Sequence, residues 1–233
     1  MVEEMSTSVD YWLSAEYKRQ EARIVGDASP AKLLNKKLLS VMASWRKKFD
    51  KKADDIAIWF VRRADAYASR SVSNKLRAAG MTVNMRMTPE VRNVLDSLYE
   101  TQVNLIKSIP QQYLTQVSTL VQESVSRGRD ISFLKEELQK RYGITERRAR
   151  FIAADQNNKA SNEISRRRMI SAGVKKGIVK HRSGGSKSYR HSHVKADGQE
   201  YDLEVGFWDS HLKRFVQPGE LPGCKCEFRP VIE

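Results

Sequence analysis

Apolar residues recur at intervals of three and four along much of the first 170 residues. A short amphipathic stretch at 8–24 comes first, and a turn is predicted at 26–30. A long apolar stripe follows: Leu34, Leu38, Met42, Trp45, Phe49, Ala53, Ile56 and Phe60. This spacing places the side chains on one face of an α-helix. We therefore expect a long helix here, and we expect its aromatic residues Trp45, Trp59 and Phe60 to lie in the protein core.

The stripe is interrupted at 78–90, and a second helical pattern begins directly afterwards. Thr88 followed by Pro89 is a typical helix start, with the threonine as N-cap and the proline in the first turn. Pro110 lacks an N–H and clashes with the preceding turn, so we expect it to kink or end this helix. The apolar pattern then continues and stops near Gly128.

Two more helices are predicted before residue 173. Asp130 is positioned to cap a short helix that ends at Gly143, and Thr145 to cap another that ends at Gly173. Glycine often follows a helix because it adopts the left-handed conformation without strain. Residues 30–172 therefore predict four or five helices with short connections.

After Gly173 the pattern changes to short alternating segments. Residues 174–182 alternate like a strand, and SGGSKS at 183–188 is a flexible turn. Residues 189–205 suggest two short strands around Asp197-Gly198, a strong turn dipeptide. The segment 226–232 resembles a final strand. We expect an α+β protein: a predominantly α-helical N-terminal body at 1–143, and a small C-terminal α+β module of short antiparallel strands at 144–233.

The chain is strongly basic, with 42 Lys and Arg against 28 Asp and Glu and a formal net charge of +14. Such a surplus implies a polyanionic partner, an acidic protein surface or a membrane face. No stretch approaches the roughly 18–20 apolar residues that span a bilayer. The acidic, polar N-terminus is unlike a signal peptide. We therefore expect an intracellular protein, not bound to a membrane, with nucleic acid or an acidic protein as its partner.

Arginines are dense on the last predicted helix and continue as lysines just after it. Guanidinium groups can hold phosphate through paired donors, so we consider these residues candidates for contact with double-stranded DNA. Such binding would be backbone-directed and steeply salt-dependent. The alternative is ion pairing with nearby acidic groups. The candidate set is Arg147, Arg148, Arg150, Arg166, Arg167, Arg168, Lys175 and Lys176.

The two cysteines, Cys224 and Cys226, are too close in sequence to form an unstrained disulfide with each other. Together with His193 and His191 they offer ligand types that suit zinc. A loop-rich module would gain folding free energy from such a metal. The alternative is that the thiols pack as small apolar groups while the histidines form local hydrogen bonds.

The same region could compose a general acid–base set for a nuclease or toxin-like effector, with Arg190 as a phosphate clamp. The alternative is structural: Arg190 and His193 would pair with Asp197 or with backbone carbonyls. Since a second carboxylate and a clear nucleophile are missing, we do not expect an enzyme. The residues of the catalytic alternative are Arg190, His191, His193, Asp197 and His211.

An ordered series of motifs covers the last third of the chain. R-A-R-F-I-A at 148–153 comes first, and S-A-G-V at 171–174 ends the helix. Arg190-x-x-His193, Asp197-Gly198, Pro218-Gly219 and Leu221-Pro222-Gly223 follow. Cys224-Lys225-Cys226 and Arg229-Pro230 close the series. In order and spacing this resembles the C-terminal domain of the phage Mu F-like head-morphogenesis family, whose motif residues here are Arg190, His193, Asp197, Gly198, Cys224 and Cys226.

The resemblance implies a minor capsid protein of a bacteriophage head. Such a protein would act in head morphogenesis near the portal vertex and would contact the portal or the major capsid protein. It would be a virion component present in a few copies, assembled in the host cytoplasm, and it would aid the packaging or ejection of DNA. The stretch at 152–156 reads I-A-A-D-Q, whereas the family commonly has I-A-R-T-E. The arginine and glutamate of that stretch are therefore missing here.

Overall fold

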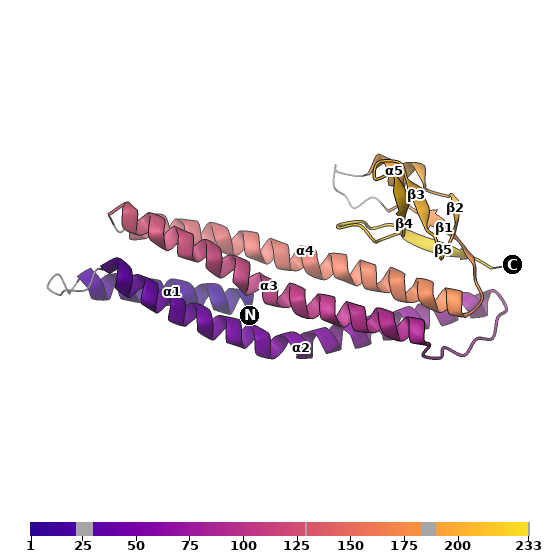
Figure 1. Ribbon diagram of the computed structural model, residues 1–233, viewed down its shortest axis with the longest axis horizontal. Helices are drawn as coiled ribbons and strands as arrows, with labels where there is room; N and C mark the ends of the chain where they lie inside the picture. Colours follow the sequence, from indigo (N-terminus) through magenta and orange to yellow (C-terminus); the bar gives the residue numbers. More distant parts are fainter. Residues whose placement is uncertain (22–29, 129, 183–189, 233) are drawn as a thin grey trace. The chain divides into compact units, whose positions relative to one another are not determined.

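The computed structural model describes residues 1–21, 30–128, 130–182 and 190–232 (Figure 1). The chain divides into two compact units, which are described separately: residues 1–56 with 102–150, and residues 57–101 with 151–233. The long helices are α1 (Val2–Glu21), α2 (Pro30–Ala78), α3 (Pro89–Ser126) and α4 (Ile131–Ser171). A module of short strands follows them, so the predicted α+β class is confirmed.

Three of the predicted helix boundaries that rest on capping residues are confirmed, those at Thr88, Asp130 and Gly173. The Thr88 hydroxyl accepts the backbone N–H of Val91 at 3.3 Å, and the Asp130 carboxylate accepts that of Phe133 at 2.9 Å. Each oxygen satisfies one of the free donors in a first helical turn. Gly173 ends α4 with φ +90°, the left-handed conformation expected of a helix C-cap.

The helices between these boundaries are fewer and longer than predicted. Pro110 lies inside α3 without ending it, and α4 runs through Gly143 without a break. Thr145 is no cap, because its hydroxyl donates to the Arg141 carbonyl within the helix. An interior glycine costs a helix only about 1 kcal/mol, which packing readily offsets. The helix boundary expected at Gly143 is therefore wrong, and the functional division between 143 and 144 stays a prediction.

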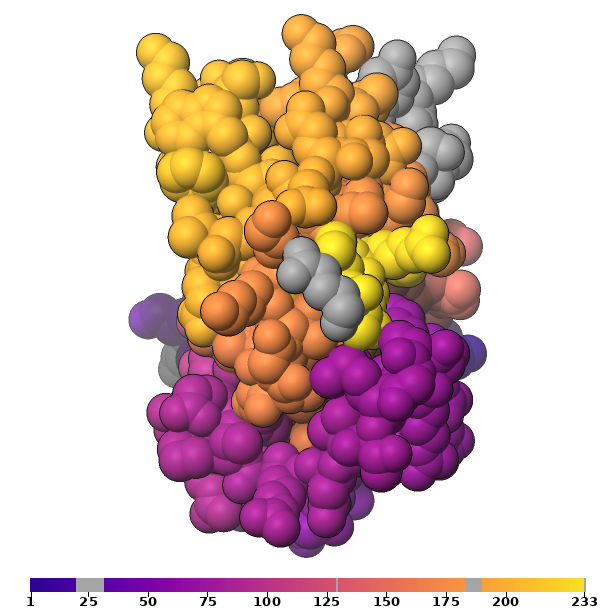
Figure 2. All heavy atoms as spheres, turned by 90° about the vertical axis from the view of Figure 1, so that its right-hand side faces the viewer, coloured from indigo at the N-terminus to yellow at the C-terminus, as the bar shows by residue number. Residues whose placement is uncertain are grey.

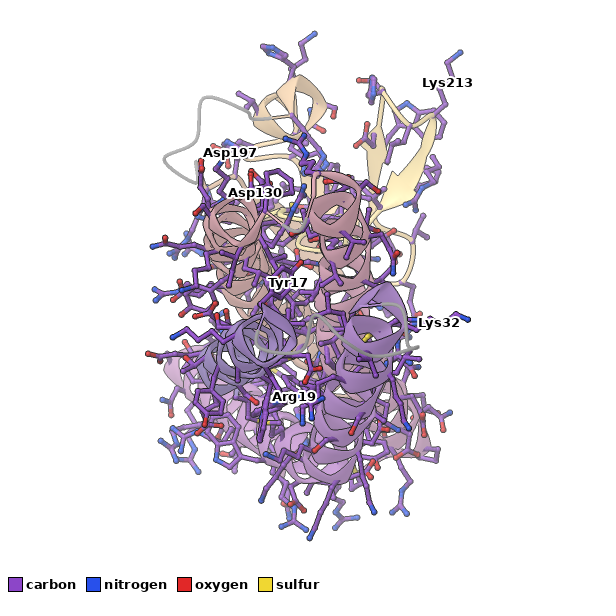
Figure 3. All side chains as sticks on the ribbon, turned by 90° about the vertical axis from the view of Figure 1, so that its left-hand side faces the viewer. Tyr17, Arg19, Lys32, Asp130, Asp197 and Lys213 are labelled. Carbon is purple, nitrogen blue, oxygen red and sulfur yellow. The ribbon has the colours of Figure 1, made fainter. Side chains whose placement is uncertain are left out.

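The first unit is a helical bundle around an apolar core. The predicted stripe on α2 is buried here from Leu34 to Ala53 and packs with residues of α1, α3 and α4. Tyr17, labelled in Figure 3, is 1% exposed, and its hydroxyl donates to Ser124 at 2.7 Å. Ser124 in turn donates to the Asp130 carbonyl at 2.7 Å. This chain of hydrogen bonds ties α1 to the end of α3.

The α2 stripe changes register after Ala53. Burial continues at intervals of four, through Ala57 and Val61, while Ile56 is 38% exposed. Trp59 is 61% exposed, so its predicted place in the core is wrong. In the second unit the stripe is rich in alanine, and Ala64 and Ala68 pack against Ala160 and Ile164 of α4.

The strand module contains a three-stranded antiparallel sheet in the order β2-β1-β5 and a separate β3–β4 hairpin. The strands are β1 (Lys176–Lys180), β2 (Glu200–Asp202), β3 (Phe207–Asp209), β4 (Arg214–Val216) and β5 (Glu227–Val231). Pro230 is tolerated because β5 lies at a sheet edge, where a missing N–H costs least. Figure 2 shows the surface of this module in orange and yellow.

One predicted strand of the module is a helix. Residues 191–195 form α5 (His191–Lys195), while the second predicted strand of that hairpin appears as β2. Gly198, at φ +80°, confirms the turn at Asp197-Gly198. The turn predicted at 26–30 and the one at 183–188 lie wholly or largely outside the described residues. Among the helices that the structure describes, none is long and apolar enough to cross a bilayer.

Candidate metal centre

His193, Cys224 and Cys226 form a compact buried group in the strand module. Their ligand atoms all lie within 4.8 Å of one another. The Nδ1 atom of His193 lies 3.4 Å from the sulfur of Cys224 and 3.5 Å from that of Cys226. The group joins α5 to the loop that precedes β5. The structure thus brings together three of the four residues predicted as metal ligands, and the group could hold a metal ion.

The other ring nitrogen of His193 fixes how the ring presents Nδ1. Nε2 lies 3.1 Å from a carboxylate oxygen of Asp209, and both side chains are almost fully buried. An ionised carboxylate can only accept, so Nε2 carries the proton of this hydrogen bond. In the neutral ring, Nδ1 is then unprotonated and faces both sulfurs. This is how a metal-binding histidine is commonly oriented by an outer partner.

Asp209 is suited to stay ionised although it is buried. Burial raises the pKa of its carboxyl, but hydrogen bonds from the backbone N–H groups of Leu212 and His211, together with the bond to His193, leave the pKa lower than usual. The hairpin turn between β3 and β4 thus supplies the donors that hold the carboxylate.

The pKa values of the two thiols are shifted in opposite directions. A hydrogen bond from Cys226 lowers the pKa of Cys224 to about 4, against the opposing effect of burial. The same hydrogen bond, together with burial, raises the pKa of Cys226. A thiolate is the form of cysteine that binds metals, so the lowered pKa of Cys224 favours metal binding.

Helix α4 holds the cysteine loop by its backbone. Asp155 accepts the N–H of Gly223 at 2.6 Å. The side-chain amides of Asn158 and Asn162 donate to the carbonyls of Cys224 at 2.6 Å and Cys226 at 3.1 Å. Positions 155, 158 and 162 lie on one face of the helix. Asp155 belongs to the stretch that departs from the family's I-A-R-T-E, so this departure supplies a loop-binding carboxylate.

His191 lies outside this buried group, although it was part of the predicted ligand set. It is exposed, whereas His193 is 1% exposed. In the expected strand, residues two apart would point to the same face, but in α5 they are about 200° apart around the helix axis. The change from strand to helix therefore directs His191 away from the group that contains His193.

The residues of the catalytic alternative are not gathered into a site. Arg190, His191, Asp197 and His211 are exposed, while His193 is buried against Asp209. Arg190 donates to the Pro222 carbonyl at 2.9 Å, as the structural alternative predicted. A buried imidazole cannot contact a nucleic-acid phosphate unless the module opens, so this geometry gives no support to a nuclease.

The candidate DNA-binding residues differ sharply in their surroundings. Arg166 and Arg168 are each 5% exposed. Arg166 pairs with Glu163 and donates to the Leu203 carbonyl at 2.8 Å, and Arg168 pairs with Asp65 at 2.6 Å. Arg167 is half-buried and pairs with Glu163 and Glu204. For these three arginines the ion-pairing alternative describes the structure.

The remaining members of that set are more accessible. Arg148 is half-buried and lies 3.4 Å from the Ser108 hydroxyl. Arg150 pairs with Glu146 and Lys176 with Glu200, while both keep exposed side chains. Arg147 and Lys175 are also exposed. DNA contact by these four exposed residues stays a prediction: Arg147, Arg150, Lys175 and Lys176.

Sequence reasoning missed His181. Its Nδ1 atom lies 3.5 Å from the Cys226 sulfur, and its backbone N–H donates to Asp197 at 2.9 Å. His181 meets Cys226 because β1 pairs with β5. The sequence does not specify this strand pairing, so no local signal could have identified His181.

Comparison with known proteins agrees with the motif series. Residues 115–229 match the model of the family described as Phage Mu protein F like protein. Over 219 residues, covering 92% of this chain, the sequence is 28% identical to an uncharacterized protein of Haemophilus influenzae. The match covers 47% of that relative, so the chain spans about half the relative's length. No solved structure matches the chain.

The matched region begins within α3 and ends within β5, and it contains each residue of the buried group described above. The residues of the motif series that the structure brings together, His193, Cys224 and Cys226, therefore lie inside the region that defines the family. Residues 115–229 of this chain are thus similar to the Phage Mu protein F like family, a structural family of phage head morphogenesis.

Proposed function

We propose that this chain is a minor head protein that acts in phage head morphogenesis at the portal vertex. The observation that carries the proposal is the family match over residues 115–229. The long helices of residues 1–143 would dock to the portal or to the major capsid protein. A virion component assembled in the host cytoplasm fits the same family.

The strand module offers a second contact surface for a protein partner. Trp208 and Phe215 pair across the β3–β4 hairpin with ring centroids 5.3 Å apart, and they are 52% and 50% exposed. Leu212, in the hairpin turn, is 42% exposed. Neighbouring exposed apolar side chains of this kind are typical of surfaces that bind proteins. We place a capsid or portal contact here.

The exposed cations would contact packaged DNA without sequence preference. Besides Arg147, Arg150, Lys175 and Lys176, helix α2 contributes a large share of the charge, because it carries thirteen basic and four acidic residues. Lys47, Lys48, Lys51 and Lys52 are all exposed on it. Exposed lysines attract a phosphate backbone because their binding releases its counterions.

Deletion of the gene from a phage or prophage that encodes this chain tests the head-assembly role. We expect particles to fall strongly in number or infectivity, and the full chain supplied in trans to restore them and to co-purify with heads. A Trp208→Ser/Phe215→Ser variant should fold and rescue poorly, whereas a Tyr67→Ser variant, at another exposed aromatic residue, should rescue fully. Normal particles without the chain would refute the role.

A further inference from the structure

The pairing of β1 with β5 brings a fourth candidate metal ligand, His181, next to the buried group. In this antiparallel register Lys180 lies opposite Glu227. His181 directly follows Lys180, and Cys226 directly precedes Glu227, so the two residues are opposite one another at the same end of the ladder. The 3.5 Å separation of His181 Nδ1 from the Cys226 sulfur agrees with this register. The contact therefore follows from the backbone pairing.

We propose that the strand module binds one zinc ion through Cys224, Cys226, His193 and His181. This site goes beyond the proposed head-assembly function and does not depend on it. It replaces the exposed His191 of the sequence prediction by His181. The four side chains make a Cys₂His₂ set, which is a usual composition of closed structural zinc sites.

The nitrogen–sulfur separations have the size that a shared zinc ion requires. With Zn–S near 2.3 Å and Zn–N near 2.0–2.1 Å, a tetrahedron places nitrogen and sulfur about 3.5 Å apart. The separations found are 3.4 Å and 3.5 Å from His193 to the two sulfurs, and 3.5 Å from His181 to Cys226. His181 contacts Cys226 but lies outside the group whose ligand atoms are all within 4.8 Å of one another, so zinc binding requires it to move toward Cys224 and His193.

Hydrogen bonds alone would leave this arrangement incompletely satisfied. Nδ1 of His193 has one lone pair in the ring plane, yet two sulfurs lie at hydrogen-bonding distance from it. One S–H group can donate well to that lone pair, so the second sulfur contact of His193 is left without a proper hydrogen bond when the ring is neutral with its proton on Nε2. A metal ion between the four groups satisfies every contact at once, with both cysteines as thiolates.

Two carboxylates orient the histidine ligands. Asp209 accepts from Nε2 of His193, and Asp197 accepts the backbone N–H of His181 at 2.9 Å. The first contact is the carboxylate–histidine pairing typical around zinc. The second fixes the chain where it leaves β1. Asp197 is a residue of the family motif, and positioning His181 gives it a role that the motif itself does not reveal.

The ion would join three segments of the module that are distant in sequence. His181 follows β1, His193 lies on α5, and the cysteines precede β5. Among these ligands His181 is partly exposed, and it lines a cavity of about 670 Å³, so an ion from solution can reach this ligand. Because the strands are only three to five residues long, binding would add to the folding free energy of the module.

Metal analysis of the reduced full-length chain tests the site. Elemental analysis should find about one zinc per chain, and cobalt substituted for zinc should give the intense visible bands of a tetrahedral site with thiolate charge transfer. His181→Ala should weaken zinc binding by more than the roughly 10–100-fold typical of losing an outer partner. His191→Ala is the matched control and should bind like the parent chain.

Each outcome of this experiment decides the proposal. The cobalt spectrum of the unmodified chain reports on the ligands without any substitution, so a variant that fails to fold does not leave the site untested. A chain that takes up no zinc or cobalt when reduced and reconstituted overturns the site. Equal zinc affinity in His181→Ala and His191→Ala removes His181 from it. Failure here would leave the deletion phenotype of the head-assembly role unaffected.

Discussion

The Nε2 atom of His193 lies 3.1 Å from the Asp209 carboxylate, with both side chains at most 2% exposed. The contact joins α5 to the end of β3, and it directs the other ring nitrogen toward the two cysteines. A buried carboxylate is costly unless it is well paired. Here it receives the imidazole and two backbone donors, so the pairing has structural value even before a metal is bound.

Asp209→Asn should weaken zinc binding by roughly 10–100-fold, because an amide supports the imidazole less strongly than a carboxylate. Competition with a chromophoric chelator would measure the affinity. Glu200→Gln is the control, since Glu200 is exposed and pairs with Lys176 at the sheet edge. Equal affinities for the two variants would show that Asp209 does not orient a ligand.

Arg168→Ala should destabilise the second unit by about 3 kcal/mol, because it leaves Asp65 without the partner that now lies 2.6 Å away. Arg147→Ala, at an exposed position, should change stability by less than about 0.5 kcal/mol. Urea unfolding followed by circular dichroism compares them. Two similar, small effects would mean that the buried arginine is not a structural residue.

Two glycines with positive φ should respond differently to alanine. A Cβ at Gly206 would lie 2.6 Å from the Val216 carbonyl oxygen, whereas one at Gly198 would meet nothing within 4 Å. Gly198→Ala should therefore cost about 1–2 kcal/mol from backbone strain alone. Gly206→Ala should cost clearly more, because the backbone of β4 must also move. Thermal unfolding would measure the order, and the reverse order would contradict the packing described for the hairpin.

Removing exposed lysines should reduce the salt dependence of DNA binding. In a Lys47→Ala/Lys51→Ala variant, we expect the slope of log K against log salt to fall by about 0.9 for each phosphate that the protein no longer neutralises. Lys140→Ala is the control, because Lys140 already pairs with Glu136 and Glu137. Fluorescence titration with duplex DNA gives the slopes. An unchanged slope would remove α2 from the DNA-binding surface.

Local signals in the sequence predicted much of the helical fold. The cap at Thr88, the cap at Asp130 and the left-handed glycine at 173 act within one helical turn, so they can be identified without tertiary information. Gly143 and Pro110 failed as helix ends because the long-range packing of α3 and α4 outweighs a local cost. The exposure of Trp59 was also not predictable from local signals. After Ala53 a different set of α2 positions is buried, and which positions these are depends on what the helix packs against.

The ligand residues that can be identified by their chemical type and spacing alone were predictable from the sequence. Paired cysteines and a nearby histidine are visible in the chain, and the structure brings Cys224, Cys226 and His193 together. The partner Asp209 and the ligand candidate His181 were not predictable, because tertiary packing and strand register bring them to the group. His191, which was also named as a ligand because of its residue type, is exposed on α5 and lies outside the buried group.

The head-assembly role is tested most directly by electron microscopy of intact particles with the chain labelled at one end. We expect density for the chain at a single vertex, where the portal lies, together with the chain in the protein content of purified heads. Label spread over all vertices would contradict the portal assignment. Mature particles and assembly intermediates that both lack the chain would contradict a structural part in the head.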